Sequence, residues 1–319
     1  MINKWYYRLK PLIPRPVQLA MRKKFVRMQW KKYRDVWPID ERAATLPSSW
    51  SGWPEGKRFA LVLTHDVDTA RGIDRCLDLA AMESSLGFRS SFNMVPERYP
   101  IPKDLRRSLT GKGFEVGVHG LYHDGKYFES LEIFLARAQK INHYLKEWNA
   151  VGFRTPSMLH NLEWIAALNI EYDASTFDTD PFEPQSDGVR TIFPIRVPAN
   201  SLGKGYVELP YTLPQDFTLF VLFRETSIEI WRKKLDWIAE KGGMALLNVH
   251  PDYMAFNGAE RGPEEYPASY YKEFLEYVRR RYQGVYWNPL PSEIARFWKR
   301  NGMSDHIPAA KERAGERRG

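Results

Sequence analysis

The sequence of 319 residues contains a single cysteine, Cys76, so no disulfide can form within the chain. This fits a reducing compartment. The sequence also lacks any run approaching the ~20 apolar residues that a membrane-spanning helix needs. Charged residues interrupt the N-terminus every few positions, which excludes the apolar region of a signal peptide. We therefore expect a cytoplasmic protein.

Most of the chain has little net charge. Residues 1–35 carry eleven Lys and Arg against one Asp, which leaves 36 basic and 38 acidic residues in the other 284. The net charge of +8 therefore belongs to one N-terminal segment. This distribution argues against a nucleic-acid partner and indicates a separate cationic arm.

Several catalytic motifs are also missing. The sequence has no Gly-x-Ser-x-Gly motif, no Gly-rich phosphate loop and no internal repeat. Cys76 falls in the middle of a predicted helix. A serine or cysteine nucleophile is therefore not indicated.

The first 50 residues form a basic N-terminal extension. A helix is predicted over residues 17–34, with Val17, Met21, Phe25 and Met28 on one stripe and most basic side chains elsewhere. Such a helix can lie on an anionic membrane, which would give residues 1–35 a peripheral contact with the inner face of the membrane. Alternatively, the apolar stripe packs on the catalytic domain and the basic face is solvated. Aromatic residues that would favour a membrane interface are interleaved with the charges: Trp5, Tyr6, Tyr7, Phe25, Trp30 and Tyr33.

Residues 51–300 form the predicted catalytic domain, and residues 301–319 form a polar tail. Apolar runs predict strands over 59–64, 90–95, 114–118, 150–153 and 244–249. Helices are predicted over 68–86, 103–110, 130–148, 162–168, 228–241, 266–281 and 291–300. Strands that alternate with helices of this length indicate βαβ units, and therefore an α/β fold with a parallel sheet or barrel.

Two carboxylates stand at the end of the first strand. Asp66 and Asp68 are two residues apart, so on a strand their side chains point to the same side. The carboxyl ends of parallel strands are where sites are built. Two carboxylates this close repel each other unless a positive charge lies between them, and a metal ion would supply it.

Two histidines follow a later strand. His119 and His123 are spaced i, i+4, which predicts one face of a helical turn that grips a single ion. With Asp68 they make a three-ligand set that leaves a coordination position for water, as catalytic zinc requires. Arg154 and His250 each follow a strand as well. Arginine can hold a carboxylate ionised, and histidine can protonate a leaving amine.

Together these residues resemble the polysaccharide deacetylase family, which is carbohydrate esterase family four or the NodB-homology domain. The resemblance covers roughly residues 57–298. It rests on five motifs in order: Thr64-His65-Asp66-Val67-Asp68, His119-Gly120-Leu121-Tyr122-His123, Arg154-Thr155-Pro156, Tyr172-Asp173-Ala174-Ser175 and Leu247-Asn248-Val249-His250.

The resemblance implies a distorted (β/α) barrel, a carbohydrate substrate and a divalent metal, with zinc as the first choice. It implies Asp66 as general base, Arg154 as its orienting partner and His250 as general acid, with Asp68, His119 and His123 as metal ligands. It also implies Asp173 as the partner that tunes His250, a role that Asp178 or Asp180 could take instead.

Three positions depart from the family pattern. Val67 separates two aspartates that are usually adjacent, which leaves open which of them is the base. Gly120 replaces a usual Ser or Thr, and Asn248 stands where an apolar residue commonly lines the acyl pocket.

These observations predict a metal-dependent hydrolase that removes an N-acyl group, acetyl in the first instance, from an amino sugar. Two alternatives stay open. One is an amidohydrolase of a small linear or cyclic amide, and the other is a catalytically silent scaffold that binds sugar or membrane.

Overall fold

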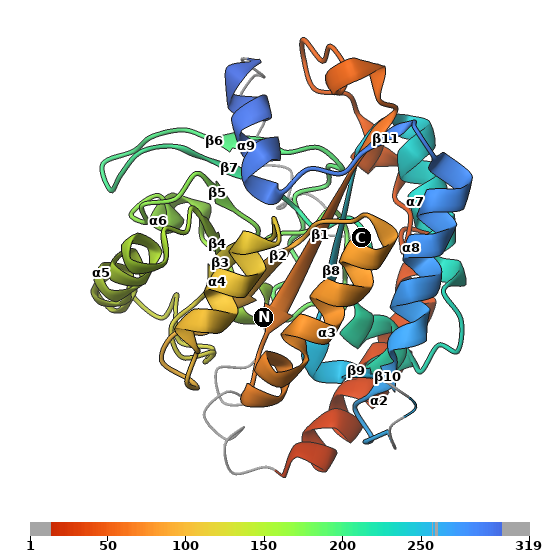
Figure 1. The fold of residues 1–319 in the computed structure, drawn as a ribbon, viewed down its shortest axis with the longest axis horizontal. Coiled ribbons are helices and arrows are strands. Elements are labelled where there is room, and N and C mark those ends of the chain that lie inside the picture. Colours follow the sequence, from red (N-terminus) through yellow and green to blue (C-terminus); the bar gives the residue numbers. More distant parts are fainter. Residues whose placement is uncertain (1–13, 257, 259–260, 302–319) are drawn as a thin grey trace, which may run out of the picture.

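The computed structural model describes residues 14–256, 258 and 261–301. The strands in this part of the chain are β1 (Phe59–Val67), β2 (Ser91–Met94), β3 (Glu115–His119), β4 (Gly152–Arg154), β5 (Tyr172–Asp173), β6 (Ile195–Val197), β7 (Tyr206–Glu208), β8 (Met244–Val249), β9 (Met254–Ala255), β10 (Tyr266–Pro267) and β11 (Tyr286–Trp287). Nine of them form one curled sheet in the order β11-β1-β2-β3-β4-β5-β7-β6, and β8 also pairs with β1 (Figure 1). Among these described strands only the β6–β7 pair is antiparallel, while β9 and β10 form a separate parallel pair.

The sheet curls until its two sides nearly meet. Beyond β7 the chain continues to Leu213, which forms a parallel bridge with Leu247 of β8. The backbone N–H of Leu213 donates to the carbonyl of Leu246 at 3.1 Å. The result is an incomplete barrel, which confirms the predicted distorted (β/α) barrel.

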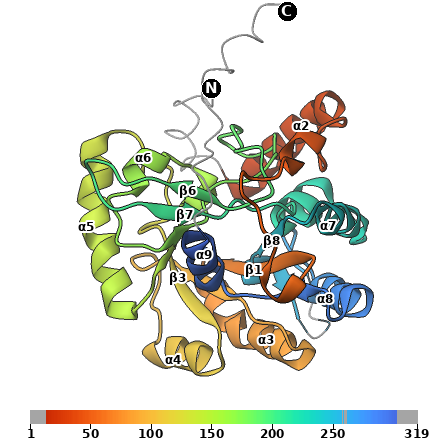
Figure 2. The same ribbon diagram turned by 90° about the horizontal axis from the view of Figure 1, so that it is seen from above.

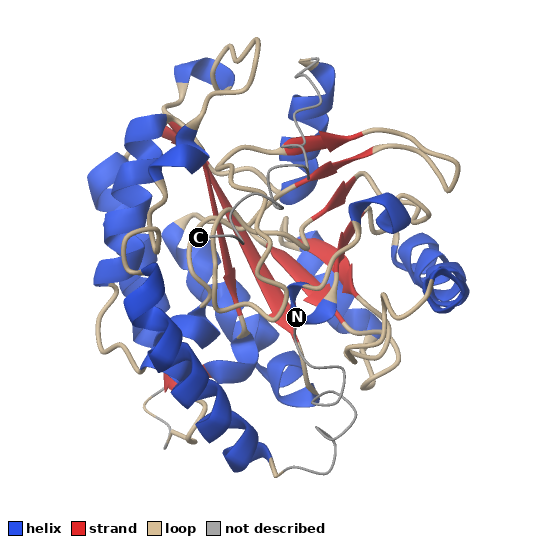
Figure 3. Ribbon diagram, turned by 180° about the vertical axis from the view of Figure 1, so that it is seen from behind, coloured by secondary structure: helices blue, strands red, loops and turns tan. Residues whose placement is uncertain are grey.

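Helices surround the sheet, as Figures 2 and 3 show from above and from behind. The α-helices are α2 (Arg15–Tyr33), α3 (Ala70–Leu86), α4 (Lys103–Gly111), α5 (Leu131–Trp148), α6 (Leu162–Ile165), α7 (Glu229–Lys241), α8 (Ala268–Tyr282) and α9 (Pro291–Arg300). The shorter helical segments are η2 (Glu41–Ala44), η3 (Pro54–Gly56), η4 (Pro156–Met158), the π-helix η5 (Phe217–Phe223) and η6 (Pro251–Tyr253). The predicted elements are all present, and their ends differ from the predictions by at most three residues.

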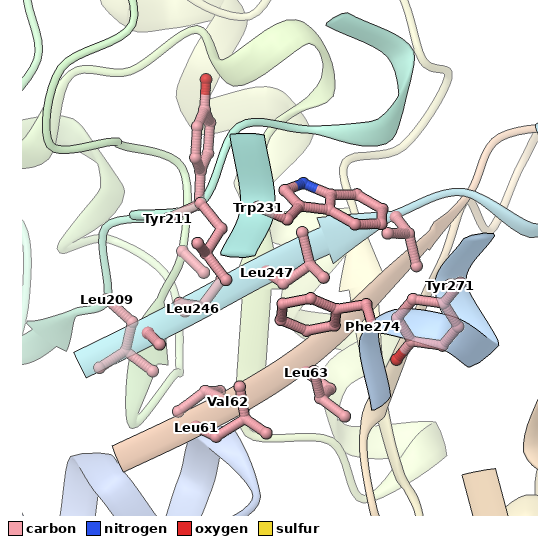
Figure 4. Close-up of a cluster of buried hydrophobic side chains, with 14 of the residues drawn as sticks. Leu61, Val62, Leu63, Leu209, Tyr211, Trp231, Leu246, Leu247, Tyr271 and Phe274 are labelled. Carbon is pink, nitrogen blue, oxygen red and sulfur yellow. The ribbon is translucent and has the colours of Figure 1, made fainter. Parts of the chain in front are cut away.

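The core is densest around the two central strands. Every residue of β1 and of β8 is buried. Figure 4 shows Leu63 of β1 and Leu247 of β8 near Trp231 of α7 and Phe274 of α8. Because side chains on both faces of these strands are buried, the strands read as continuous apolar runs in the sequence. Their rigid carboxyl ends provide the platform for the candidate site.

The predicted N-terminal helix is present as α2, and it docks on the barrel. Its Leu19 and Val26 are 7% and 1% exposed. The ring of Trp30 lies 5.1 Å from that of Trp37 and 4.9 Å from that of Phe223, measured between centroids. The helix thus contacts η5, at the end of the molecule toward which the β1 arrow points in Figure 1.

The face that docks is not the predicted one. Val17, Met21, Phe25 and Met28 are 47%, 50%, 49% and 62% exposed. The predicted alternative of docking on the catalytic domain is therefore confirmed, but the stripe predicted to dock is wrong, because a second apolar face of α2 makes the contact. Outside the described residues lie Trp5, Tyr6, Tyr7 and the tail from residue 302. Within the described residues, no helix is long and apolar enough to span a bilayer.

Candidate metal centre and catalytic site

Six predicted site residues lie on or just beyond four strands of the sheet. Asp66 and Asp68 belong to the end of β1, and His250 directly follows β8, its parallel neighbour. On the other side of β2, His119 of β3 is in register with Arg154 of β4. Parallel strands end at the same edge, so residues far apart in sequence gather there.

Three of these residues converge as predicted. Asp68, His119 and His123 each offer a ligand atom, and these atoms lie within 4.8 Å of one another. The Oδ1 atom of Asp68 is 3.4 Å from Nε2 of His119 and 2.9 Å from Nε2 of His123. The structure therefore brings together one carboxylate and two imidazoles, which is a donor set suited to zinc.

The protonation of this cluster favours a cation. Nδ1 of His119 lies 3.1 Å from the carbonyl oxygen of Arg154. A carbonyl only accepts, so Nδ1 carries a proton and donates it to this oxygen, while Nε2 faces Asp68. Burial lowers the pKa of His123, although Asp68 opposes this effect, so its imidazole is neutral at neutral pH. The cluster is thus a buried carboxylate that faces two imidazole rings, and a divalent cation would neutralise the carboxylate charge.

The two histidines do not lie on a helical turn, so that part of the prediction is wrong. His119 is the last residue of β3, and the chain then bends through Gly120 at φ 65° and His123 at φ 55°. Left-handed backbone at both positions breaks any helical repeat. The loop, not a helix, turns the second imidazole back toward the first.

Gly120 is required at this bend for a second reason. A Cβ atom there would lie 2.5 Å from the Tyr127 hydroxyl and 2.6 Å from Cδ of Pro156. The same hydroxyl accepts hydrogen bonds from the backbone N–H groups of Leu121 and Tyr122. Tyr127 therefore steadies the loop from outside, in the absence of a hydroxyl at position 120.

Asp66 lies at the centre of a buried hydrogen-bond network. Its Oδ1 accepts from Asn93 at 3.0 Å and from Nη1 of Arg154 at 3.1 Å, and its Oδ2 accepts from Asn248 at 2.9 Å. Burial alone would raise the pKa of Asp66, but the charge of Arg154, followed by that of His119, outweighs it and holds the pKa well below its usual range. Asp66 is therefore ionised and fixed in orientation.

Arg154 is itself immobilised. Its Nε donates to the carbonyl of Ala174 at 2.7 Å, and its Nη1 also donates to Asn248 Oδ1 at 2.5 Å. Asn248 in turn donates to Gln215 at 3.1 Å. The amide that replaces the expected apolar residue thus braces both Arg154 and Asp66. This function of Asn248, and the presence of Asn93, escaped the sequence reasoning.

His250 has a partner that the sequence reasoning missed. Its Nδ1 is 2.7 Å from Oδ1 of Asp216, and its backbone N–H donates to Oδ2 of the same carboxylate at 2.7 Å. The hydroxyl of Tyr266 also donates to Oδ2, at 3.0 Å. Burial lowers the pKa of His250, but Asp216, with smaller effects of Asp68 and Asp66, raises it to about 10. The imidazole is therefore protonated at neutral pH.

The three aspartates predicted as candidates to tune His250 have other partners. Asp173 accepts from Ser175 at 2.6 Å, Asp178 pairs with Lys234 at 2.7 Å, and Asp180 accepts from Tyr211 at 2.9 Å. The prediction that one of them tunes His250 is wrong. The signal for Asp216 was available, because Gln215-Asp216 is a polar pair between two apolar runs.

A further carboxylate supports the loop after β1. Oδ2 of Asp252 accepts from the backbone N–H of Asp68 at 2.9 Å, and its Oδ1 accepts from the Thr69 hydroxyl at 2.5 Å. Burial, together with the charge of Asp68, raises the pKa of Asp252 to about 6. Asp252 thus fixes the backbone that presents the candidate ligand.

Comparison with solved structures identifies the fold. A protein assigned as a polysaccharide deacetylase from Mycobacterium smegmatis superimposes with a TM-score of 0.62 at 18% identity. A second protein so assigned, from Pseudomonas aeruginosa PAO1, gives a TM-score of 0.58 at 15% identity. In each case the match covers 83% of this chain and 98% of the other. This chain has the polysaccharide deacetylase fold.

The same fold also carries another activity. The allantoinase Puue superimposes with a TM-score of 0.59 at 15% identity, with the same 83% and 98% coverage. Neither the models of protein families nor the curated protein sequences gave a match. The deacetylase fold is thus recognised from structure, while the chemistry must be argued from the site.

Proposed function

We propose that this chain is a metal-dependent hydrolase that removes an N-acyl group, acetyl in the first instance, from an amino sugar in a polysaccharide, oligosaccharide or lipid-linked glycan. The observation that carries the proposal is the gathering of three functions at one sheet edge. These are a two-imidazole, one-carboxylate cluster, an ionised carboxylate at Asp66 and a protonated imidazole at His250. The catalytic unit is proposed to span residues 51–300, between the extension 1–50 and the tail 301–319.

Asp68, His119 and His123 would hold the metal. Zinc suits two imidazoles and one carboxylate, although cobalt, nickel or manganese could substitute. A divalent cation held there would act as a Lewis acid toward an amide carbonyl and toward water.

Asp66 accepts the proton of the attacking water. Its Oδ2 lies 3.9 Å from Nε2 of His119, so the carboxylate borders the proposed metal cluster. Hydrogen bonds from Asn93, Arg154 and Asn248 keep it ionised, and they also make it a weak base. A weak base would suffice here, because a cation held by Asp68, His119 and His123 would make the attacking water more acidic.

His250 supplies the proton that the departing nitrogen needs. An amine leaves poorly as an anion, so amide hydrolysis depends on a general acid. Because Asp216 binds Nδ1 of His250, Nε2 is the nitrogen left to donate. Asp216 positions the ring and keeps it charged.

Hydrolysis of a small cyclic or linear amide is the second candidate. The similarity to an allantoinase fold supports it, since the same base, ligand set and acid would serve a ring amide. A catalytically silent scaffold is the third, and the hydrogen-bonded pairing of His250 with Asp216 argues against it.

The test is a substrate panel for the zinc-loaded full chain and its Asp66→Asn variant. The panel holds N-acetylglucosamine oligomers, peptidoglycan fragments, a polyprenyl-linked N-acetylhexosamine and allantoin. We expect acetate and a free amine from at least one sugar, and a large loss in the variant. Turnover of allantoin alone would replace the proposal with the small-amide hydrolase. Metal binding without any turnover would favour the silent scaffold.

A further inference from the structure

Helix α2 has two apolar faces, and within the described part of the chain only one of them packs against other elements. Successive residues of an α-helix are rotated by about 100°, because a turn contains 3.6 residues. Leu19, Val26 and Trp30 therefore share the face that docks on the barrel. The exposed stripe, formed by Val17, Met21, Phe25 and Met28, lies on the opposite side, and each member is about half exposed.

A basic band runs beside the exposed stripe. Lys23, Lys24, Arg27 and Lys31 lie between the two apolar faces of α2. With Arg224, the residue after η5, they line a groove of about 750 Å³ together with Ala20 and Met28. Among the described residues that line this groove none is acidic, although the charge of Glu264 acts on Lys23. The band therefore presents positive charge next to exposed apolar side chains.

We propose that this surface, the exposed stripe with the basic band, docks the chain on an anionic lipid bilayer. Peripheral binding needs apolar side chains that enter the interface and cations that meet acidic headgroups, and α2 presents both side by side. A second copy of the chain fits less well. A two-fold contact through this surface would place the two basic bands close together, and like charges repel.

Docking through α2 would bring the candidate site close to the bilayer. Arg22 of α2 lies over the ring of Phe217, at 5.3 Å from its centroid. Phe217 contacts Tyr253 at 5.2 Å, and Tyr253 contacts His250 at 5.1 Å, both between ring centroids. Two aromatic rings thus connect the membrane-facing helix to the proposed general acid. If the proposed function holds, on which this consequence rests, a lipid-linked glycan at the membrane surface is the favoured substrate.

The test is flotation of the full chain with vesicles of phosphatidylcholine, with and without phosphatidylglycerol. We expect binding only to the anionic vesicles. Binding should weaken at high salt, because the Debye length falls from ~10 Å at 0.1 M to ~3 Å at 1 M ionic strength. Reversal of three charges, Lys24→Glu, Arg27→Glu and Lys31→Glu, should weaken binding at least ~100-fold, because each basic residue adds ~1 kcal/mol.

A second variant tests the apolar part, and a third is the control. Met21→Ser, Phe25→Ser and Met28→Ser together should also abolish flotation, while lowering the melting temperature only slightly because these side chains are about half exposed. The control reverses three exposed charges on α4 and at its C-cap, across the barrel from α2 (Figure 2): Lys103→Glu, Arg107→Glu and Lys112→Glu. It should bind like the unmodified chain.

Three outcomes would overturn the proposal. The first is equal flotation of the α2 and α4 charge variants. The second is that the unmodified chain does not float but forms a dimer in light scattering, and that the serine variant is a monomer. A second copy would then cover the stripe. The third is flotation only after removal of residues 1–13, which would mean that the chain covers its own surface. Flotation needs no catalysis, so the membrane proposal can fail while turnover of a soluble sugar persists. Equally, the chain can float while turnover, and with it the proposed function, fails.

Discussion

Replacement of Asp216 by Asn would test the proposed general acid most directly. The substitution keeps the shape of the side chain but removes the charge next to Nδ1 of His250, at 2.7 Å. That charge is the largest influence that raises the pKa of His250, which burial lowers. We therefore expect the imidazole to lose its proton at a lower pH in the variant.

The size of the shift follows from the interaction that is lost. A hydrogen bond to a charged group contributes about 1.5–3 kcal/mol. One pKa unit corresponds to about 1.36 kcal/mol, so the pKa of His250 should fall by about 1–2 units. The alkaline limb of the pH profile of kcat/KM reports the pKa of the general acid in the free enzyme. This limb should shift to lower pH by the same amount.

Folding stability gives a readout that needs no substrate. The pKa of His250 is raised from 6.5 to about 10 in the folded chain, so the folded state binds its proton more tightly than the unfolded state does. This contribution is complete below about pH 6.5 and disappears as the pH rises through about 10. The difference in unfolding free energy between the unmodified chain and Asp216→Asn should therefore be largest near pH 6 and shrink toward pH 10.

The matched control is Tyr266→Phe. It removes a neutral donor from Asp216 but leaves the carboxylate charge, so the alkaline limb should stay in place. The reasoning would be refuted if Asp216→Asn left the alkaline limb unmoved, or if its stability deficit were the same at pH 6 and pH 10.

Three further predictions concern the metal cluster and its loop. His119→Ala should lose the metal in elemental analysis, since it removes one of three ligands; full occupancy would contradict the assignment. Asp66→Asn should keep the metal and lose ~10²–10⁴-fold in activity, whereas Asp68→Asn should lose metal affinity as well. The opposite behaviour would exchange the two roles. Gly120→Ala should lower the melting temperature and the metal affinity, because its φ of 65° and the nearby Tyr127 hydroxyl both disfavour a Cβ atom. Unchanged metal affinity would show that the loop can adapt.

The strands and the edge where the site lies could be predicted from the sequence. Buried parallel strands appear as short apolar runs, and the runs before Asp66, His119, Arg154 and His250 gave their positions within a few residues. Polar residues that end such runs must lie at one edge of a parallel sheet. The convergence of Asp68 and His119 therefore followed from local pattern and sheet geometry, whereas the loop through Gly120 brings His123 to them.

The docking face of α2 could not be predicted in the same way. Val17, Met21, Phe25 and Met28 have the spacing of a buried stripe, yet they are exposed. The apolar face formed by Leu19, Val26 and Trp30 is narrower, and the basic residues around it make its periodicity hard to recognise in the sequence. Periodicity shows that a face is apolar, but only a complementary surface, here Trp37 and Phe223 beside Trp30, decides which face is buried.

The sequence by itself determined the fold class, the strand ends and the side chains that meet there, because these depend on local periodicity. Only the tertiary structure decided which buried acid reaches His250. Asp216 is 34 residues away from it, and Asn248 is 182 residues away from Asp66, which it contacts. The sequence favoured Asp173, with Asp178 or Asp180 as the alternatives, and it did not indicate Asp216. The curl of the sheet and the path of the chain from β7 to η5 bring Asp216 to the imidazole, and no local pattern encodes those distances.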